Sequence, residues 1–262
     1  MEIENEDKEK LRFFIKTGIV VLSFLVICAF GFKYIPKALS VTNLANAREL
    51  PIYCVNSQEK KVGLSFDAAW GNDDTADILK ILEKHNIKVT FFMTGGWIEK
   101  YPDDVKAIAA AGHDLGNHSE NHKHMSQLSK EQSIEEIMKP HNKVKELTGI
   151  DMNLFRPPYG DYNNTLIQAT REAGYHCIQW DVDSLDWKDY GAKSIVDTVV
   201  NNNHLGNGSI ILCHNGAKYT KDALDSMITG LKDKGYEIVP ISQLIYTGEY
   251  YMDHEGRQFE KK

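Results

Sequence analysis

The chain has 262 residues, of which 42% are hydrophobic, and a formal net charge of -7. A chain of this length can bury one sizeable core, which favours a single α/β domain. The acidic balance excludes a nucleic-acid binder, because no basic excess is available to neutralise phosphates, and it suits a neutral or polar ligand.

The first predicted element is an apolar segment from Thr17 to Phe32, which carries no charge and follows several basic residues. This pattern is typical of a signal peptide or signal anchor that translocates the following domain. We expect a transmembrane anchor at residues 17–34, after a cytoplasmic segment at residues 1–16. The protein would then be a single-pass protein of the cell membrane, with its main domain outside the cytoplasm. The alternative is cleavage near Ala47, which would give a secreted protein.

Short apolar runs alternate with helical patterns after a polar connector at residues 35–60. The apolar runs predict strands at 62–66, 88–93, 113–116, 154–155, 176–180, 209–213 and 236–239. Residues with helical spacing predict helices at 74–85, 98–111, 130–147, 164–173, 192–203, 222–234 and 242–245. Ser129 and Gln132 form a capping box before the third helix, and Gly149 ends it.

Regular alternation of strands and helices predicts a parallel sheet. The number of such units predicts a distorted (β/α)7-type barrel, formed by a single domain at residues 61–246. The charged and aromatic tail at residues 247–262 has no period and is predicted to be loosely ordered. In a fold of this kind, reactive side chains belong at the C-terminal ends of the strands.

Polar and titratable residues do follow the predicted strands. They are Asp67 after the first, His118 after the third, Arg156 after the fourth, Asp183 and Asp186 after the fifth, and His214 after the sixth. Each has a plainer interpretation, such as a cap, a stiff turn or a core histidine. His118 and His122 are four residues apart, and a helical turn would place both rings on one face, where they could hold a metal ion.

These residues lie in five ordered motifs between Ser65 and Gly216, which read SFD, HSENH, RPPYG, DSLDW and LCHNG. The set resembles the motifs of the NodB-homology polysaccharide deacetylases, carbohydrate esterase family 4. The resemblance covers the chain from about Lys60 to Ile245. Within this family, the chain is most similar to the sporulation-associated deacetylases of Gram-positive bacteria, whose first motif also reads FDxxWG.

The resemblance implies a role for each matching residue. His118 and His122 would hold a divalent metal. Zinc is the metal expected, and cobalt, nickel or manganese are the alternatives. Asp67 would be the general base, and Arg156 would orient it. The Tyr159 backbone N–H would stabilise an oxyanion, and His214, held by Asp186, would protonate the leaving amine. Trp187 and Leu212 would wall the pocket for the acetyl methyl group.

The chain departs from the family pattern at one position. The family has two consecutive aspartates in the first motif, the second being a metal ligand, whereas this chain has Ala68 after Asp67. Three outcomes follow: Asp73 or Asp74 replaces the ligand, His124 or a water does so, or metal binding is poor. Asp73 and Asp74 also read as ordinary carboxylates at a helix N-terminus.

The activity implied by the resemblance is hydrolysis of N-acetyl groups on N-acetylglucosamine or N-acetylmuramic acid units of peptidoglycan, or of a chitin-like oligomer, with release of acetate. The expected partners are this polysaccharide and, through the N-terminal segment, the membrane; nucleic acid is excluded and a monomer is expected. Two alternatives remain. One is a glycan-binding protein with little or no turnover, because of Ala68; the other is an esterase that acts on an O-acetylated glycan.

Overall fold

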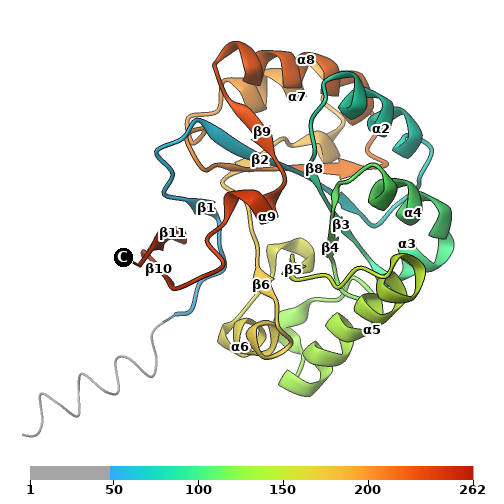
Figure 1. The fold of residues 1–262 in the computed structure, drawn as a ribbon, viewed down its shortest axis with the longest axis vertical. Coiled ribbons are helices and arrows are strands. Elements are labelled where there is room, and N and C mark those ends of the chain that lie inside the picture. Colours follow the sequence, from blue (N-terminus) through green and yellow to red (C-terminus); the bar gives the residue numbers. More distant parts are fainter. Residues whose placement is uncertain (1–47, 262) are drawn as a thin grey trace, which may run out of the picture. The chain divides into compact units, whose positions relative to one another are not determined.

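The computed structural model describes residues 48–261, and the chain from Glu49 onward forms one compact unit. A parallel sheet of eight strands crosses this unit (Figure 1), with the order β6-β5-β4-β3-β2-β8-β7 and with β9 also paired to β2. The strands are β2 (Lys61–Ala68), β3 (Thr90–Met93), β4 (Asp114–Asn117), β5 (Leu154–Phe155), β6 (His176–Cys177), β7 (Val182–Asp183), β8 (Ile210–Asn215) and β9 (Glu237–Val239).

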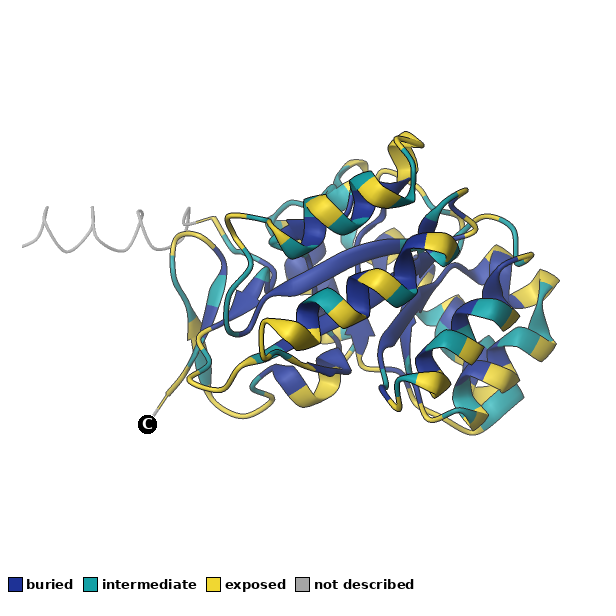
Figure 2. Ribbon diagram, turned by 90° about the horizontal axis from the view of Figure 1, so that it is seen from above, coloured by how far each residue is buried: buried dark blue, intermediate teal, exposed yellow. Residues whose placement is uncertain are grey.

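Helices alternate with these strands along the chain. They are α2 (Thr75–Lys84), α3 (Gly95–Lys100), α4 (Pro102–Ala110), α5 (Lys130–Thr148), α6 (Asn164–Glu172), α7 (Ala192–Val200), α8 (Thr220–Asp233) and α9 (Ile241–Leu244). Figure 2 shows the strands buried and the helices with one buried and one exposed side. This pattern is expected where a sheet is covered by amphipathic helices.

The sheet is open between β6 and β7. These strands stand at the two ends of the strand order, and no pairing joins them among residues 48–261. Ile52 covers the free side of β6, because its N–H donates to the Cys177 carbonyl at 2.8 Å and its carbonyl accepts from the Gln179 N–H at 2.7 Å. The predicted parallel α/β class is therefore confirmed, but the sheet forms a half-barrel and not a closed one.

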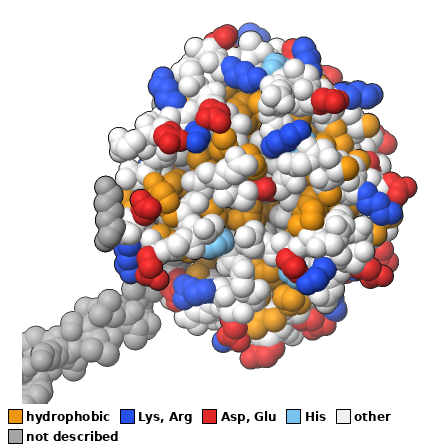
Figure 3. All heavy atoms as spheres, viewed as in Figure 1, with side chains coloured by type: hydrophobic (Ala, Val, Ile, Leu, Met, Phe, Trp, Pro, Cys, Tyr) orange, Lys and Arg blue, Asp and Glu red, His pale blue; other side chains and the backbone are white. Residues whose placement is uncertain are grey.

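The surface of the compact unit has mixed charge. On the face shown in Figure 3, Asp and Glu side chains lie between the Lys and Arg side chains. Within residues 48–261, no helix combines the length and apolar character needed to cross a membrane. The segment predicted to be an anchor, residues 17–34, lies outside the described residues.

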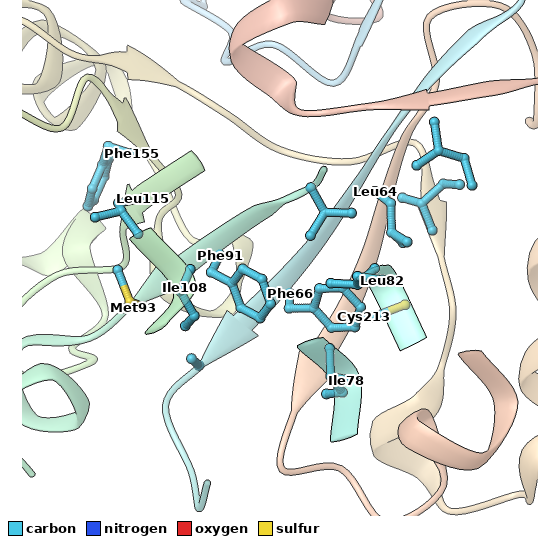
Figure 4. Packing of buried hydrophobic residues seen from close by; sticks show 14 of the residues in the cluster. Leu64, Phe66, Ile78, Leu82, Phe91, Met93, Ile108, Leu115, Phe155 and Cys213 are labelled. Carbon is cyan, nitrogen blue, oxygen red and sulfur yellow. The ribbon is translucent and has the colours of Figure 1, made fainter. Parts of the chain in front are cut away.

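The main core lies between the sheet and its helices (Figure 4). Phe66 of β2 and Phe91 of β3 stack with ring centroids 5.2 Å apart, and Leu82 of α2 packs in the same buried cluster. β2 is buried along almost its whole length, as expected for a central strand of a parallel sheet. This packing fixes the strand that carries Asp67 at its C-terminal end.

The single helix predicted at residues 98–111 is wrong, because the structure has two helices there, α3 and α4. Pro102 is the first residue of α4. Proline has no N–H to donate to the preceding turn, so it starts a helix readily but interrupts one that is already running. Tyr101, between the two helices, has a non-helical backbone (φ -129°, ψ 54°).

The prediction of a loosely ordered tail is also wrong. The tail forms an antiparallel hairpin of β10 (Tyr250–Met252) and β11 (Arg257–Glu260). β11 pairs in parallel with β1 (Cys54–Val55), which lies in the stretch expected to be a connector. Strand β1 and the hairpin thus form a second, three-stranded sheet.

Gly208 is a position where a side chain has no room. Its φ is +82°, and a Cβ there would lie 1.9 Å from the Val55 carbonyl oxygen. Gly208→Ala is therefore expected to lower the free energy of unfolding by more than the ~1–2 kcal/mol that a left-handed backbone alone costs. Gly149→Ala is the matched control, because Gly149 has φ +77° and open space around it. Equal losses for the two variants in urea unfolding would contradict this account.

Candidate active site

The residues singled out in the sequence meet in one cavity of about 450 Å³ at the C-terminal ends of the strands. The cavity is lined by Asp67, Ala69, Trp70, His118, His122, Tyr159, Trp180, Asp183, Trp187, Leu212 and His214. Asp67 and His214 are direct partners in the register of β2 and β8. The topology of the sheet therefore places a carboxylate and an imidazole side by side.

Asp67 forms a buried ion pair. Its Oδ1 accepts a hydrogen bond from Arg156 Nη1 at 2.7 Å, and both side chains are almost inaccessible. Arg156 is held in turn by the Gln179 carbonyl, 3.2 Å from Nη2, and its guanidinium lies over the Phe92 ring. Burial, the largest single influence, would raise the pKa of Asp67, but the charge and hydrogen bond of Arg156 together with His118 and His214 outweigh it and the pKa is lowered. Asp67 is therefore ionised at neutral pH.

His118 and His122 come together on a loop, so the predicted helical turn is wrong. Ser119 (φ 65°) and His122 (φ 53°) adopt left-handed backbone conformations. The Asn117 side chain accepts from the Ser119 N–H, and Ser119 Oγ accepts from the His122 N–H. These two bonds fold the loop so that the ring centroids of His118 and His122 are 4.9 Å apart.

The ring of His118 is oriented by the backbone of the Arg156 loop. Its Nδ1 lies 2.8 Å from the Arg156 carbonyl oxygen and so carries the proton, since a carbonyl can only accept. Its Nε2 is left facing Asp67 Oδ2 at 3.5 Å. Burial lowers the pKa of His118 to about 4, so the ring is neutral at physiological pH.

His214 is paired with a buried carboxylate. Asp186 Oδ1 lies 2.7 Å from His214 Nδ1, and Asp186 Oδ2 accepts from the His214 N–H at 2.7 Å and from Thr220 Oγ1 at 2.6 Å. Burial, the largest single influence, would lower the pKa of His214, but the hydrogen bond and charge of Asp186 together with the charges of Asp67 and Asp183 outweigh it and the pKa is raised. His214 therefore holds a proton to higher pH than a free histidine does.

Tyr159, Trp187 and Leu212 lie in the same cavity, as the sequence predicted. Tyr159 has a left-handed backbone (φ 60°, ψ 7°), and its ring meets His122 with centroids 4.5 Å apart. Leu212 is buried, whereas Trp187 is half exposed. The cavity therefore combines an ionised carboxylate, three imidazoles and an apolar wall.

Comparisons with known proteins show the family of this chain. The family described as polysaccharide deacetylase matches residues 55–178. The peptidoglycan-N-acetylmuramic acid deacetylase PdaA of Bacillus subtilis is 33% identical over 201 residues, which cover 75% of this chain and 76% of PdaA. The chain belongs to the polysaccharide deacetylase family.

Two other similar proteins are not described as active deacetylases. An uncharacterised protein of B. subtilis, YlxY, is 32% identical over 78% of this chain, but the match spans only 63% of YlxY. The crystal structure of BA3943 from Bacillus anthracis, described as a pseudoenzyme of carbohydrate esterase family 4, superposes with a TM-score of 0.71 at 33% identity, covering 77% of this chain and 70% of BA3943. A mutant of BA3943 is described as having restored enzymatic activity.

The cavity lacks a complete set of metal ligands among the residues that the structure describes. Zinc sites normally take three protein ligands and a water, and His118 and His122 offer two imidazole nitrogens. Among residues 48–261, no three or more His, Cys, Asp or Glu side chains are arranged to hold a metal ion. The described donors thus do not fit the three-ligand zinc site that the resemblance implied.

The structure brings neither of the proposed replacement aspartates to the two histidines. Asp73 and Asp74 line a separate pocket of about 250 Å³. The Asp74 carboxylate accepts the Gly216 N–H at 2.9 and 3.0 Å. His124 stacks on the Tyr159 ring at 4.3 Å and is absent from the residues that line the cavity.

The two alanines that follow Asp67 lie in different surroundings. Ala68 is fully buried in the hydrophobic core cluster, and it is Ala69 that lines the cavity. Position 68, where the family pattern has a carboxylate, is therefore occupied by an apolar side chain that belongs to the core.

Sequence reasoning missed three residues at the site. Trp70 and Trp180 line the cavity, and Thr220 supports Asp186. Trp70 lies within the first motif, and a large aromatic directly after a strand that ends in a reactive carboxylate was an available signal. The role of Thr220 depends on a contact between residues 34 positions apart, which no local pattern records.

Proposed function

We propose that this chain hydrolyses N-acetyl groups on the glucosamine or muramic acid units of peptidoglycan. The observation that carries the proposal is the pairing of Asp67 with His214 across β2 and β8, one with a lowered and the other with a raised pKa. A base that stays ionised beside an acid that stays protonated is what amide hydrolysis by a water requires.

The chain's own residues can carry out each proton transfer of the hydrolysis. Asp67 takes a proton from a water, whose oxygen attacks the acetyl carbonyl carbon, and the Tyr159 N–H stabilises the negative oxygen that forms. His214 donates its proton to the amide nitrogen as the C–N bond breaks. The products are acetate and a free amine on the sugar. Leu212 and Trp187, which line the cavity, would contact the acetyl methyl group.

Acetate release from defined glycans tests the proposal. The full chain is expected to release acetate from N-acetylated peptidoglycan fragments at a rate proportional to enzyme concentration. Release only from O-acetylated xylan would instead support an esterase. No release from any glycan, with or without added zinc or cobalt, would favour the glycan-binding role, to which the missing third ligand and the likeness to the pseudoenzyme BA3943 also point.

Metal binding is expected to be weak. We infer that zinc, or another divalent ion, meets only His118 and His122 in this cavity, and two imidazoles hold a metal less firmly than three ligands do. Zinc titration of the full chain by calorimetry should show low affinity that disappears in His118→Ala. His85→Ala is a suitable control, because His85 lies outside the cavity and pairs with Asp225. Tight binding retained in His118→Ala would contradict the ligand assignment.

The pairing of His214 with Asp186 predicts a change in pH dependence. Asp186→Asn removes the charge that raises the pKa of His214, so the imidazole loses its proton at lower pH. The rate of a reaction that needs protonated His214 should then begin to fall at lower pH than in the unsubstituted chain. The profile of kcat/KM against pH measures this. An unchanged alkaline limb would show that His214 is not the acid.

We also place the catalytic domain outside the cytoplasmic membrane. The support is the uncharged segment from Thr17 to Phe32, and peptidoglycan lies on that side of the membrane. Protease added to intact spheroplasts should digest the domain. Protection until the membrane is opened would overturn this placement.

A further inference from the structure

Trp70 is a large apolar side chain that the fold leaves half exposed at the active cavity. It lines the cavity and is 49% exposed. Its indole stacks on the His214 ring, with centroids 5.0 Å apart and an interplanar angle of 21°. Burial of one indole face against His214 would leave the other available to a ligand.

The backbone next to Trp70 is fixed in place. The Gly71 carbonyl accepts hydrogen bonds from Trp97 Nε1 at 3.2 Å and from Asn215 Nδ2 at 3.1 Å. Gly216 packs against this segment so closely that a Cβ there would lie 3.2 Å from the Gly71 nitrogen and oxygen. The contacts of Gly71 therefore fix the backbone that carries Trp70 at the cavity.

Exposed apolar side chains are concentrated at this cavity. In the part of the chain that the structure describes, six large hydrophobic residues are exposed: Trp70, Ile150, Tyr159, Trp187, Tyr190 and Tyr251. Three of these six, Trp70, Tyr159 and Trp187, line the same cavity. Exposed apolar area gathered at one place indicates a ligand surface.

The chemistry of these rings suits a sugar. A pyranose presents C–H groups on its faces and hydroxyl groups around its edge, so an aromatic ring can cover a face while the hydroxyls stay in water. A flat, half-exposed indole beside polar groups supplies such an apolar face.

We propose that Trp70 is a sugar-stacking residue, which binds the face of a pyranose unit of an N-acetylated glycan next to His214. This inference rests on the proposed function for the identity of the glycan. Trp70 would thus contribute to substrate affinity in the ground state, apart from any support that its ring gives to His214.

Binding without turnover tests the inference. Calorimetric titration of the full chain with the tetramer of β-1,4-linked N-acetylglucosamine is carried out in the Asp67→Asn background, so that little product forms during the titration. Adding Trp70→Ala is expected to weaken binding about tenfold, the change that ~1.4 kcal/mol produces. Trp70→Phe keeps an aromatic face and should stay within about threefold of the parent, a difference of less than 1 kcal/mol.

Tyr251→Ala is the matched control. Tyr251 is 50% exposed, but it stacks on Phe259 in the β10–β11 hairpin and does not line the active cavity. Its removal should leave affinity unchanged. A thermal melt of each variant shows whether the fold is retained.

Three results would overturn the inference: Trp70→Ala binding as tightly as the parent, Trp70→Phe losing as much affinity as Trp70→Ala, or no binding by the parent. A ring that only supports His214 would change turnover and not this affinity. If binding depends on Trp70 but the unsubstituted chain releases no acetate, the hydrolase proposal fails and the glycan site stands. If acetate is released while Trp70→Ala binds normally, the stacking role alone fails.

Discussion

Asp67→Asn is expected to lower the rate of acetate release at least ~100-fold, the low end of what a general base contributes. The amide cannot take a proton from water, yet its oxygen can still accept the hydrogen bond that Arg156 Nη1 now gives to Asp67 Oδ1. This hydrogen bond is therefore kept, but Arg156 loses its buried counter-charge, so the variant should be less stable than the unsubstituted chain. A thermal melt shows whether it is folded under the assay conditions. Initial rates on an N-acetylated peptidoglycan fragment measure the effect.

Asp77→Asn is the control for this substitution. Asp77 is a partly exposed carboxylate on α2 that pairs with Lys80 and Lys221, away from the cavity. The Asp77→Asn variant should release acetate at the rate of the unsubstituted chain. A rate for Asp67→Asn within a few-fold of the control would show that Asp67 is not the base.

Arg156→Met is expected to lower the free energy of unfolding by about 3–5 kcal/mol, the cost of leaving a buried charge without its partner. Arg156 is fully buried and Asp67 is nearly so. Methionine fills part of the arginine volume but leaves the Asp67 carboxylate without its strongest partner. The pKa of Asp67 should then rise, because burial is no longer offset by the guanidinium. Unfolding in guanidinium chloride measures the loss.

Two variants show whether the loss comes from the uncompensated charge. Arg171→Met removes an arginine that pairs with Glu49 at the surface, and such pairs contribute about 0–1 kcal/mol. The double variant Asp67→Asn/Arg156→Met removes both charges of this pair and should be more stable than Arg156→Met alone. A double variant less stable than Arg156→Met alone would mean that lost packing, and not charge, explains the effect.

The elements that sequence predicted best are those with local causes. The capping box of Ser129 and Gln132 and the left-handed Gly149 bound α5 as expected, because each depends on residues within a few positions. The buried strand β2 could be read from its apolar run. The parallel arrangement of the sheet followed from the alternation of strands with helices.

The failures have non-local causes. The hairpin at the C-terminus is an ordered sheet because β11 pairs with β1, about 200 residues away in the chain. Asp74 was a candidate ligand because it is close to Asp67 in sequence. Its carboxylate instead accepts the Gly216 N–H, 142 residues away. No pattern in one segment can report such partners.

At the site, the sequence predicted which candidate residues come together, but it did not predict the backbone that brings them there. Asp67, His118, His122 and His214 do line one cavity. The spacing of the two histidines suggested a helix, whereas side-chain bonds from Asn117 and Ser119 fold that segment into a loop. The four-residue spacing is compatible with a helix and with this loop, since each brings the two histidine rings together.

The central claim is that the cavity around Asp67 and His214 holds the acetamido group of a glycan. A crystal structure of the full chain with Asp67→Asn, bound to an N-acetylglucosamine oligomer, tests it most directly. The account predicts the carbonyl carbon between residue 67 and His214, with the methyl group against Leu212 and Trp187. A sugar bound only elsewhere, such as in the pocket lined by Tyr250 and Arg171, would contradict it.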